Sequence, residues 1–208
     1  MTPLRKQQSK VRRTHTETRV FRQKTLLKAA LVTVARYDIE GATVARICAE
    51  AGASRGLITH YFENKEDLLV ASLSSLFDEA QALKDSIAED DSLTEIERIR
   101  RIAYSSFEAP IYSWEMAAAW QAFTNTSRYN SAYKEPIRLS TQKFSDTTSP
   151  LFHLIALQQP LRLNSKDAAR GLFILSNGLW NSMAAEDNGI EPQEAMMQCN
   201  VYIEGCLK

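Results

Sequence analysis

Residues 43–69 read TVARICAEAGASRGLITHYFENKEDLL, and this stretch decides the fold of the N-terminal part of the chain. Thr43 is a favourable N-cap for a short helix that ends at Gly52, because a helix C-terminus often needs a left-handed residue. Ser54 can then cap a second short helix over residues 55–62. Two helices of about eight residues joined by a three-residue turn predict a helix-turn-helix.

The second short helix has an apolar side and a polar side. Ile58 and Phe62 lie four residues apart and are expected to face inward, against an apolar stripe of the first short helix. The other sides can reach the major groove of DNA. The candidates on these sides are Arg55, Gly56, Thr59 and His60.

Charge is unevenly distributed along the chain. The 208 residues have no net formal charge, but residues 1–65 hold 13 basic and 5 acidic side chains, a net charge of +8. The other 143 residues hold 12 basic and 20 acidic side chains, a net charge of −8. Such segregation indicates that the N-terminal part meets a polyanion, although a basic tail can also serve solubility alone. A basic tail over residues 1–17 can follow DNA phosphates.

The rest of the chain predicts long helices and no strand. Only 13 of the 208 residues are Gly or Pro, which is about half the usual share. Further helices are expected over residues 18–37, 65–89, 92–107, 114–127, 131–157 (interrupted near Pro136 and Pro150), 166–185 and 192–207. We therefore expect an all-α fold, with a three-helix head over residues 18–65 and a helical body over residues 66–208 that binds a ligand and dimerises.

Motifs of catalysis and metal binding are missing from the sequence. It has no paired Glu-x-x-His, no Gly-rich phosphate loop, no His-Glu-x-x-His and no Gly-x-Ser-x-Gly. His15 and His153 have no partner at metal-ligand spacing. We therefore expect no enzyme, no cofactor and no metal site.

Cysteine usage and hydropathy favour a cytoplasmic protein. Cys48, Cys199 and Cys206 are too few and too scattered for a disulfide framework, which indicates a reducing compartment. The basic N-terminus is not followed by the apolar segment of a secretory signal. No apolar run reaches the roughly 18 residues that span a bilayer, so no membrane partner is expected.

The same 27 residues closely resemble the DNA-binding signature of the TetR family, T-(V/I)-x-x-I-A-x-x-A-G-V-S-x-G-x-(I/L)-Y-x-(H/Y)-F-x-(N/D/S)-K-x-x-L. Two departures from it matter: Cys48 replaces a small Ala, and Thr59 replaces a Tyr that contacts DNA. The resemblance implies a homodimeric regulator, most simply a repressor that a small molecule releases from a double-stranded DNA operator. The DNA-binding residues that it implies are Thr43, Ser54, Arg55, Gly56, Thr59, His60, Tyr61 and Lys65.

One subgroup of the family is also similar in three places. The form G-x-I-(S/T)-H-Y-F at residues 56–62 is typical of the BetI-like, choline-responsive repressors of betaine synthesis. Residues 119–123 (AWQAF) and 178–180 (GLW) resemble two further segments of that subgroup, but Asn177 stands where an Asp is common. A choline-like effector is therefore one possibility, and a small, largely apolar ligand is the other.

Aromatic side chains are concentrated between residues 107 and 133. Their density suits a cavity for an apolar or cationic ligand, because π faces attract cations, and it suits an ordinary core equally well. Glu108 or Glu115 could supply the charge that a cation needs. The candidate effector-binding residues are Phe107, Trp114, Trp120, Phe123 and Trp180.

The last two predicted helices carry long apolar stripes. Such stripes from two subunits can form a four-helix dimer interface, as the resemblance implies, or they can pack inside one subunit. The candidate interface residues are Leu172, Leu175, Leu179, Met183, Met196, Cys199 and Ile203.

The sequence thus predicts a ligand-responsive, DNA-binding transcriptional regulator. A helical adaptor that binds a protein partner is the alternative. It explains the helices and the acidic body, but it leaves the basic head without a role.

Overall fold

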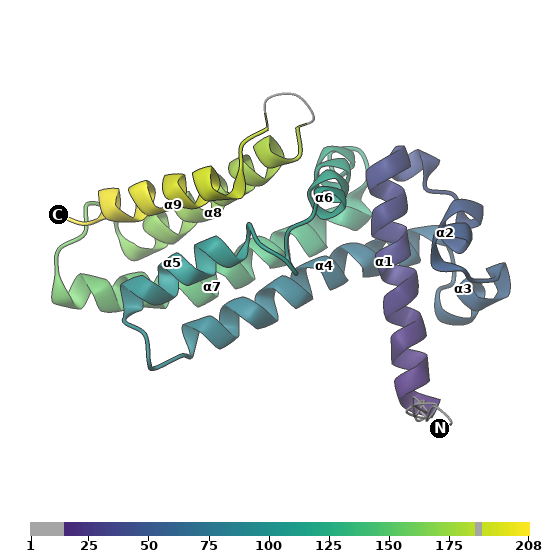
Figure 1. The fold of residues 1–208 in the computed structure, drawn as a ribbon, viewed down its shortest axis with the longest axis horizontal. Helices are drawn as coiled ribbons and strands as arrows, with labels where there is room; N and C mark the ends of the chain where they lie inside the picture. The colour runs from purple at the N-terminus through teal and green to yellow at the C-terminus, as the bar shows by residue number, and fades with distance from the viewer. Residues whose placement is uncertain (1–14, 186–188) are drawn as a thin grey trace, which may run out of the picture.

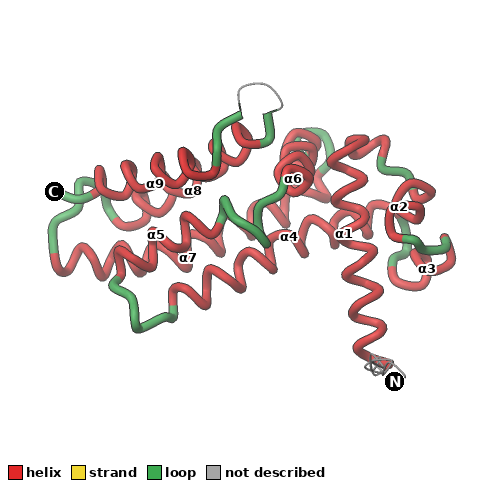
Figure 2. Tube along the Cα trace, in the orientation of Figure 1, coloured by secondary structure: helices red, strands yellow, loops and turns green. Residues whose placement is uncertain are grey.

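The computed structural model describes residues 15–185 and 189–208, and these residues form an elongated all-helical molecule (Figures 1 and 2). The expected all-α fold is confirmed, and the predicted basic tail lies almost wholly outside the described residues. Within them, the only β contact is an isolated bridge between Leu161 and Leu207. The helices are α1 (His15–Gly41), α2 (Val44–Ala51), α3 (Arg55–Tyr61), α4 (Lys65–Ala88), α5 (Glu95–Ser105), α6 (Trp114–Thr126), the 3₁₀ helix η1 (Ser131–Tyr133), α7 (Lys134–Gln158), α8 (Ser165–Met183) and α9 (Pro192–Cys206).

The first helix changes direction at Asp38, close to the break expected after Tyr37. Asp38 has φ 60° and ψ 175°, a conformation that residues other than glycine rarely adopt. Its carboxylate accepts a hydrogen bond of 2.7 Å from the Ile39 amide, which stabilises the turn. Gly41 then passes so close to Tyr37 that an added Cβ would lie 2.9 Å from the Cβ of Tyr37. The chain therefore leaves α1 at a fixed angle and enters α2.

The two short helices form the predicted helix-turn-helix. The Thr43 hydroxyl accepts a hydrogen bond from the Arg46 amide and so caps α2. Gly52 ends α2 in the left-handed conformation, with φ 60°, and its amide donates to the carbonyls of Cys48 and Ala49. Ser54 is the N-cap residue of α3 by backbone conformation, but its side chain makes no capping bond. Ile47 and Ile58 are buried between α2, α3 and α1.

The hydrophobic core of the head continues into the body. Leu68, Leu69 and Leu73 at the start of α4 belong to the same buried cluster as α1 and α2. Trp120 and Phe123 of α6 belong to it as well, and Figure 1 shows α6 beside the upper part of α1. Helix α4 begins at Lys65, so the expected boundary between residues 65 and 66 lies within its first turn, and this division of the chain stays a prediction.

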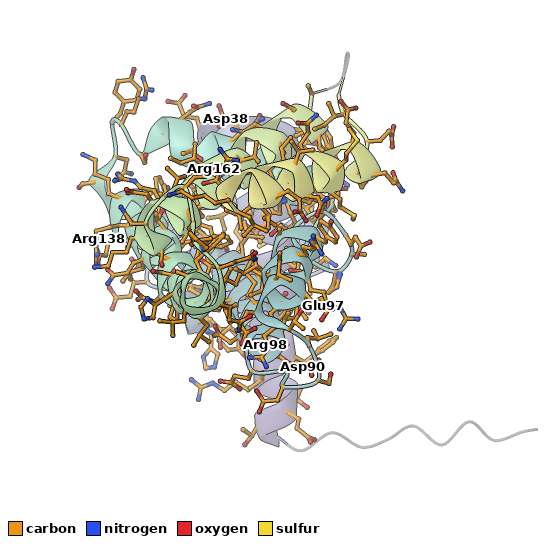
Figure 3. The ribbon with its side chains drawn as sticks, turned by 90° about the vertical axis from the view of Figure 1, so that its left-hand side faces the viewer. Asp38, Asp90, Glu97, Arg98, Arg138 and Arg162 are labelled. Atoms are coloured by element: carbon orange, nitrogen blue, oxygen red, sulfur yellow. The ribbon has the colours of Figure 1, made fainter. Side chains whose placement is uncertain are left out.

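A second core fills the body, between α5, α7, α8 and α9. Figure 3 views the molecule from the end of the body that lies opposite the head. There Arg98 donates hydrogen bonds to the carbonyls of Ala88 and Leu93 and pairs with Asp91 at 2.9 Å, which holds the α4–α5 connection. Arg162 donates to the Leu207 carbonyl at 2.9 Å and fixes the C-terminal end of the chain.

Proline has less effect on α7 than the sequence suggests. The helix runs from Lys134 to Gln158 without the interruptions expected near Pro136 and Pro150. Pro136 lies in the first turn, where no partner is needed for its missing N–H. Pro150 is exposed, while Thr148 and Leu151 beside it are buried, so packing on the other side holds the helix together.

The apolar stripes of α8 and α9 mostly face the inside of the single chain. Of the seven candidate interface residues, Leu172, Leu179, Met183, Cys199 and Ile203 are buried within the body core, and Leu175 and Met196 are half-buried. Periodicity alone does not show which side of a broadly apolar helix meets its own chain. The apolar side chains that remain exposed on these helices are Ile174 (62%), Met197 (54%) and Val201 (61%).

The turn between α2 and α3 gives a stability test. Replacing Gly52 by Ala should lower the free energy of unfolding by about 1 kcal/mol, because a Cβ opposes the left-handed conformation while nothing around it clashes. The matched control is Gly56→Ala in α3, where Ala is a better helix former and should keep or raise stability. Urea unfolding at one fixed protein concentration measures both variants. Equal stability of the two variants would contradict the role of the turn.

Candidate nucleic-acid interface and body cavity

The outer face of the helix-turn-helix exposes most of the residues predicted to contact DNA. Ser54, Arg55, Gly56, Thr59 and His60 are all exposed, while Ile58 on the opposite side of α3 is buried. The Thr59 hydroxyl donates to the Gly56 carbonyl at 3.1 Å, within the helix. The Arg55 guanidinium forms no hydrogen bond or ion pair with the described residues, so it is available to a ligand. The structure brings these five residues together on one surface.

Two hydroxyl groups lie at the starts of the two short helices. Thr43 uses an oxygen lone pair to cap α2, which leaves its own proton free to donate. Ser54 makes no capping bond at the start of α3. Because the first amides of a helix also lack partners, hydroxyls at these positions are well suited to meet phosphate oxygens.

Tyr61 and Lys65 are half-buried and have partners within the head. The Tyr61 hydroxyl donates to the Arg19 carbonyl at 3.4 Å, which ties α3 to α1. The Lys65 ammonium donates to the Ile39 carbonyl at 3.0 Å, in the turn that follows Asp38. Both side chains therefore hold the helix-turn-helix against α1, and their contact with phosphate stays a prediction.

A cavity of about 80 Å³ lies between the head core and the body core. This volume is enough for several water molecules. Helices α4, α6, α7 and α8 supply most of the wall, together with two residues of the α5–α6 connection. The lining residues are Leu76, Phe77, Ala80, Gln81, Lys84, Ser106, Ile111, Trp120, Ser140, Phe144, Phe173, Ser176, Asn177 and Trp180.

The predicted effector-binding residues divide between this cavity and other places. Trp120 and Trp180 line the cavity. Phe107 is buried in the body core, and Phe123 is buried in the head core with its ring 5.1 Å from that of Tyr133. Trp114 lies at the first position of α6, partly exposed, and its indole N–H donates to the Ala184 carbonyl at 3.2 Å.

Aromatic rings are held edge-to-face in the cavity wall. Trp120 meets Phe77 with ring centroids 5.2 Å apart. Trp180 packs against Tyr112 at 6.0 Å and donates its indole N–H to the Ser106 carbonyl. These contacts hold the Trp120 indole in the middle of α6 and the Trp180 indole near the C-terminal end of α8.

Sequence reasoning missed Lys84, whose side chain is only 7% exposed and lines the cavity. Burial lowers the pKa of Lys84 to about 8, against the opposing influence of the neighbouring Asp85 carboxylate. Lys84 follows Leu76 and Ala80 at helical spacing on the buried side of α4. A lysine in the register of an apolar stripe was the signal that could have revealed it.

Some kinds of site are not found among the described residues. No group of three or more His, Cys, Asp or Glu side chains is arranged to hold a metal ion in residues 15–185 and 189–208. Over the same ranges, no helix is both long and apolar enough to cross a membrane.

Comparison with known proteins agrees with the geometry of the head. Residues 26–72 match the sequence profile described as "Bacterial regulatory proteins, tetR family". The chain is 29% identical, over 192 residues, to the HTH-type transcriptional regulator BetI 2 of Chromohalobacter salexigens. The match covers 90% of this chain and 89% of that protein. Its relatives are thus named as transcriptional regulators and not as enzymes.

Solved structures share the fold over nearly the whole chain. A transcriptional regulator from Saccharomonospora viridis in complex with choline has a TM-score of 0.78 at 18% identity, covering 90% of this chain and 98% of that one. FadR from Bacillus subtilis in complex with stearoyl-CoA has a TM-score of 0.74 at 15% identity, covering 89% and 97%. At such identities the likeness shows the fold alone.

Lys65 and Arg55 provide a test that needs no DNA. Lys65→Ala should lower the free energy of unfolding by about 1–2 kcal/mol, because it removes a half-buried, charge-assisted hydrogen bond to the Ile39 carbonyl. Arg55→Ala should change it by less than about 0.5 kcal/mol, since the side chain is exposed and unpaired. Urea unfolding of both variants measures the difference. Equal effects would show that the Lys65 bond does not hold the head together.

Proposed function

Because this chain is a transcriptional regulator with a DNA-binding head of the tetR family, we propose that it represses transcription as a homodimer and leaves its operator when a small molecule fills the body cavity. The single observation that carries the proposal is the exposed polar face of α3, in a part of the sequence that has an excess of basic residues. Because the operator is chromosomal DNA, we place the protein in the cytoplasm.

Two sets of side chains in the helix-turn-helix would contact DNA, one set the bases and the other the phosphates. The exposed side chains of α3 would enter the major groove, where Arg55 has the donors to bind a guanine edge at two points. Thr43 and Ser54, at the helix starts, would meet phosphates. In a dimer, two such helices would read half-sites one helical turn apart, about 34–36 Å.

Helix α6 gives the ligand a mechanical route to the head. Trp120 lines the cavity and is also buried in the head core, where α6 packs on α1. A ligand that moves Trp120 would therefore shift α1 and the recognition helix relative to the body. Such coupling requires that the ligand binds the DNA-free arrangement more tightly than the DNA-bound one.

The exposed faces of α8 and α9 are our choice for the dimer interface. The candidate residues predicted from sequence are largely occupied within the chain, so the outward side chains Ile174, Met197 and Val201 replace them in this proposal. Gly178 lies one turn after Ile174, and a Cβ there would meet nothing within 4 Å, so a partner helix could approach closely. Two copies of this face would form an isologous contact.

DNA binding is tested first. We expect the full-length protein to select a preferred sequence from random duplexes, with an affinity that falls steeply as salt rises. Arg55→Ala should cost about 1–3 kcal/mol on the selected duplex and relax the preference at one base position. Arg101→Ala, which removes an exposed arginine of the body, is the matched control and should bind like the parent. Salt-insensitive or absent binding would favour the protein-adaptor alternative.

The dimer is tested separately by light scattering at micromolar concentration. Ile174→Glu combined with Val201→Glu should give a folded monomer, because both side chains are exposed in the single chain and carry no core packing. Tyr129→Glu, at a 91% exposed site in the α6–η1 connection, is the control and should remain a dimer. A parent protein that is monomeric, or a double variant that stays dimeric, would reject this interface.

A further inference from the structure

Lys84 is the most unusual side chain in the body. It lies on the buried side of α4 with 7% of its surface exposed, and it lines the cavity between the two cores. Buried lysines are rare unless they are paired, because an ammonium loses its hydration when it leaves water. Among the described residues, the fully buried side-chain N or O atom that lacks a hydrogen bond is Arg100 Nε, so the unpaired Lys84 ammonium must still reach solvent. A ligand that fills the cavity displaces this water and must itself complement the charge.

The chain itself does not supply a partner for Lys84. Within residues 15–185 and 189–208, its ammonium has no hydrogen bond and no ion pair. The nearest acid in sequence is Asp85, whose carboxylate instead accepts hydrogen bonds from Gln81 at 2.6 Å and Thr147 at 2.8 Å. Asp85 is exposed and does not line the cavity. Its carboxylate raises the pKa of Lys84 through space, but it places no negative charge in the cavity wall.

The rest of the cavity wall contains no carboxylate. Its lining residues are apolar, aromatic or neutral polar, apart from Lys84. Neither Glu108 nor Glu115, which could have balanced a cationic ligand, is among them. Ser140 and Asn177 line the same cavity, and their side chains make no hydrogen bond with the described residues, so each can donate to an acceptor. The wall is thus electropositive and rich in donors.

We propose that this cavity binds a compact organic anion, whose carboxylate pairs with Lys84 and whose apolar part lies against the rings of Trp120, Phe144 and Trp180. The inference rests on the proposed function, in which a ligand of this cavity acts on the head, and it names the chemical class of that ligand. A quaternary ammonium such as choline would place a second positive charge beside Lys84, with no acid in the wall to offset the repulsion. The small volume favours a short ligand over a long-chain one.

Binding is measured by calorimetry on the 208-residue protein without DNA, so that the outcome does not depend on an operator. The probes are the straight-chain carboxylates from butyrate to octanoate and phenylacetate, each with its neutral amide, and choline. At least one carboxylate should bind at millimolar concentration or better, and at least about tenfold more tightly than its amide, since a charge-assisted bond is lost in the amide. Binding by none of the carboxylates, or tighter binding of choline, overturns the proposal.

Two variants separate the role of Lys84 from general damage. Lys84→Met should weaken the best carboxylate at least about tenfold and leave its amide unchanged. Lys143→Met, which removes an exposed lysine paired with Asp78 outside the cavity, is the control and should bind like the parent. Lys84→Met should also raise the melting temperature of the unliganded protein, because replacing an unpaired buried charge by an apolar side chain is stabilising. A lower melting temperature would show that Lys84 has a partner within the fold, and would overturn the proposal.

The final step joins the ligand to DNA. The carboxylate that binds best should release the selected duplex from the parent protein at concentrations near its dissociation constant, and Lys84→Met should need at least about tenfold more. Carboxylate binding through Lys84 in a protein that never binds DNA would support this inference and reject the proposed function. Specific DNA binding in a protein that binds none of the carboxylates would support the proposed DNA-binding function and reject this inference.

Discussion

The burial of Trp120 and Phe123 in the core of the head is the contact on which the rest of the structure depends. Both residues belong to α6, a helix of the body, and they pack with the apolar face of α1. Without them, the head would keep only its own small core and the first turns of α4. On its own, a core of that size contributes only a few kilocalories per mole to the free energy of unfolding. The head is therefore folded and oriented by the same side chains.

This shared core joins the cavity and the helix-turn-helix in one continuous packing arrangement. Trp120 is buried in the head core and also lines the cavity, where its ring meets Phe77 of α4. Trp180 borders both cores and is held by its hydrogen bond to the Ser106 carbonyl. Because packed interiors shift between discrete arrangements instead of deforming smoothly, we propose that a ligand against these indoles would displace α6 as a unit.

Local signals in the sequence were enough to predict the head. The Thr43 cap, the left-handed Gly52 and the inward Ile58 depend on neighbours within a few residues, and the structure has all three as expected. A helix was expected from residue 92, but α5 begins at Glu95: its capping box uses Thr94 with Glu97, because the amide and hydroxyl of Ser92 both donate to Asp90. Residue type indicated a cap, but only the fold decided which hydroxyl was free to form it.

The cavity and the outer face of the body could not be predicted in the same way, since both depend on where distant helices lie. The aromatic residues between positions 107 and 133 look alike in sequence, yet Phe123 fills the head core while Trp120 reaches the cavity. On α4, Leu83 is half-buried and the adjacent Lys84 is buried, the reverse of what their hydropathy suggests. A hydrophobic pattern predicts the position of apolar side chains in the core and of charged side chains in water. Lys84 is buried along its stem while its ammonium has no partner among the described residues, so water or a ligand in the cavity supplies the interaction that the chain does not.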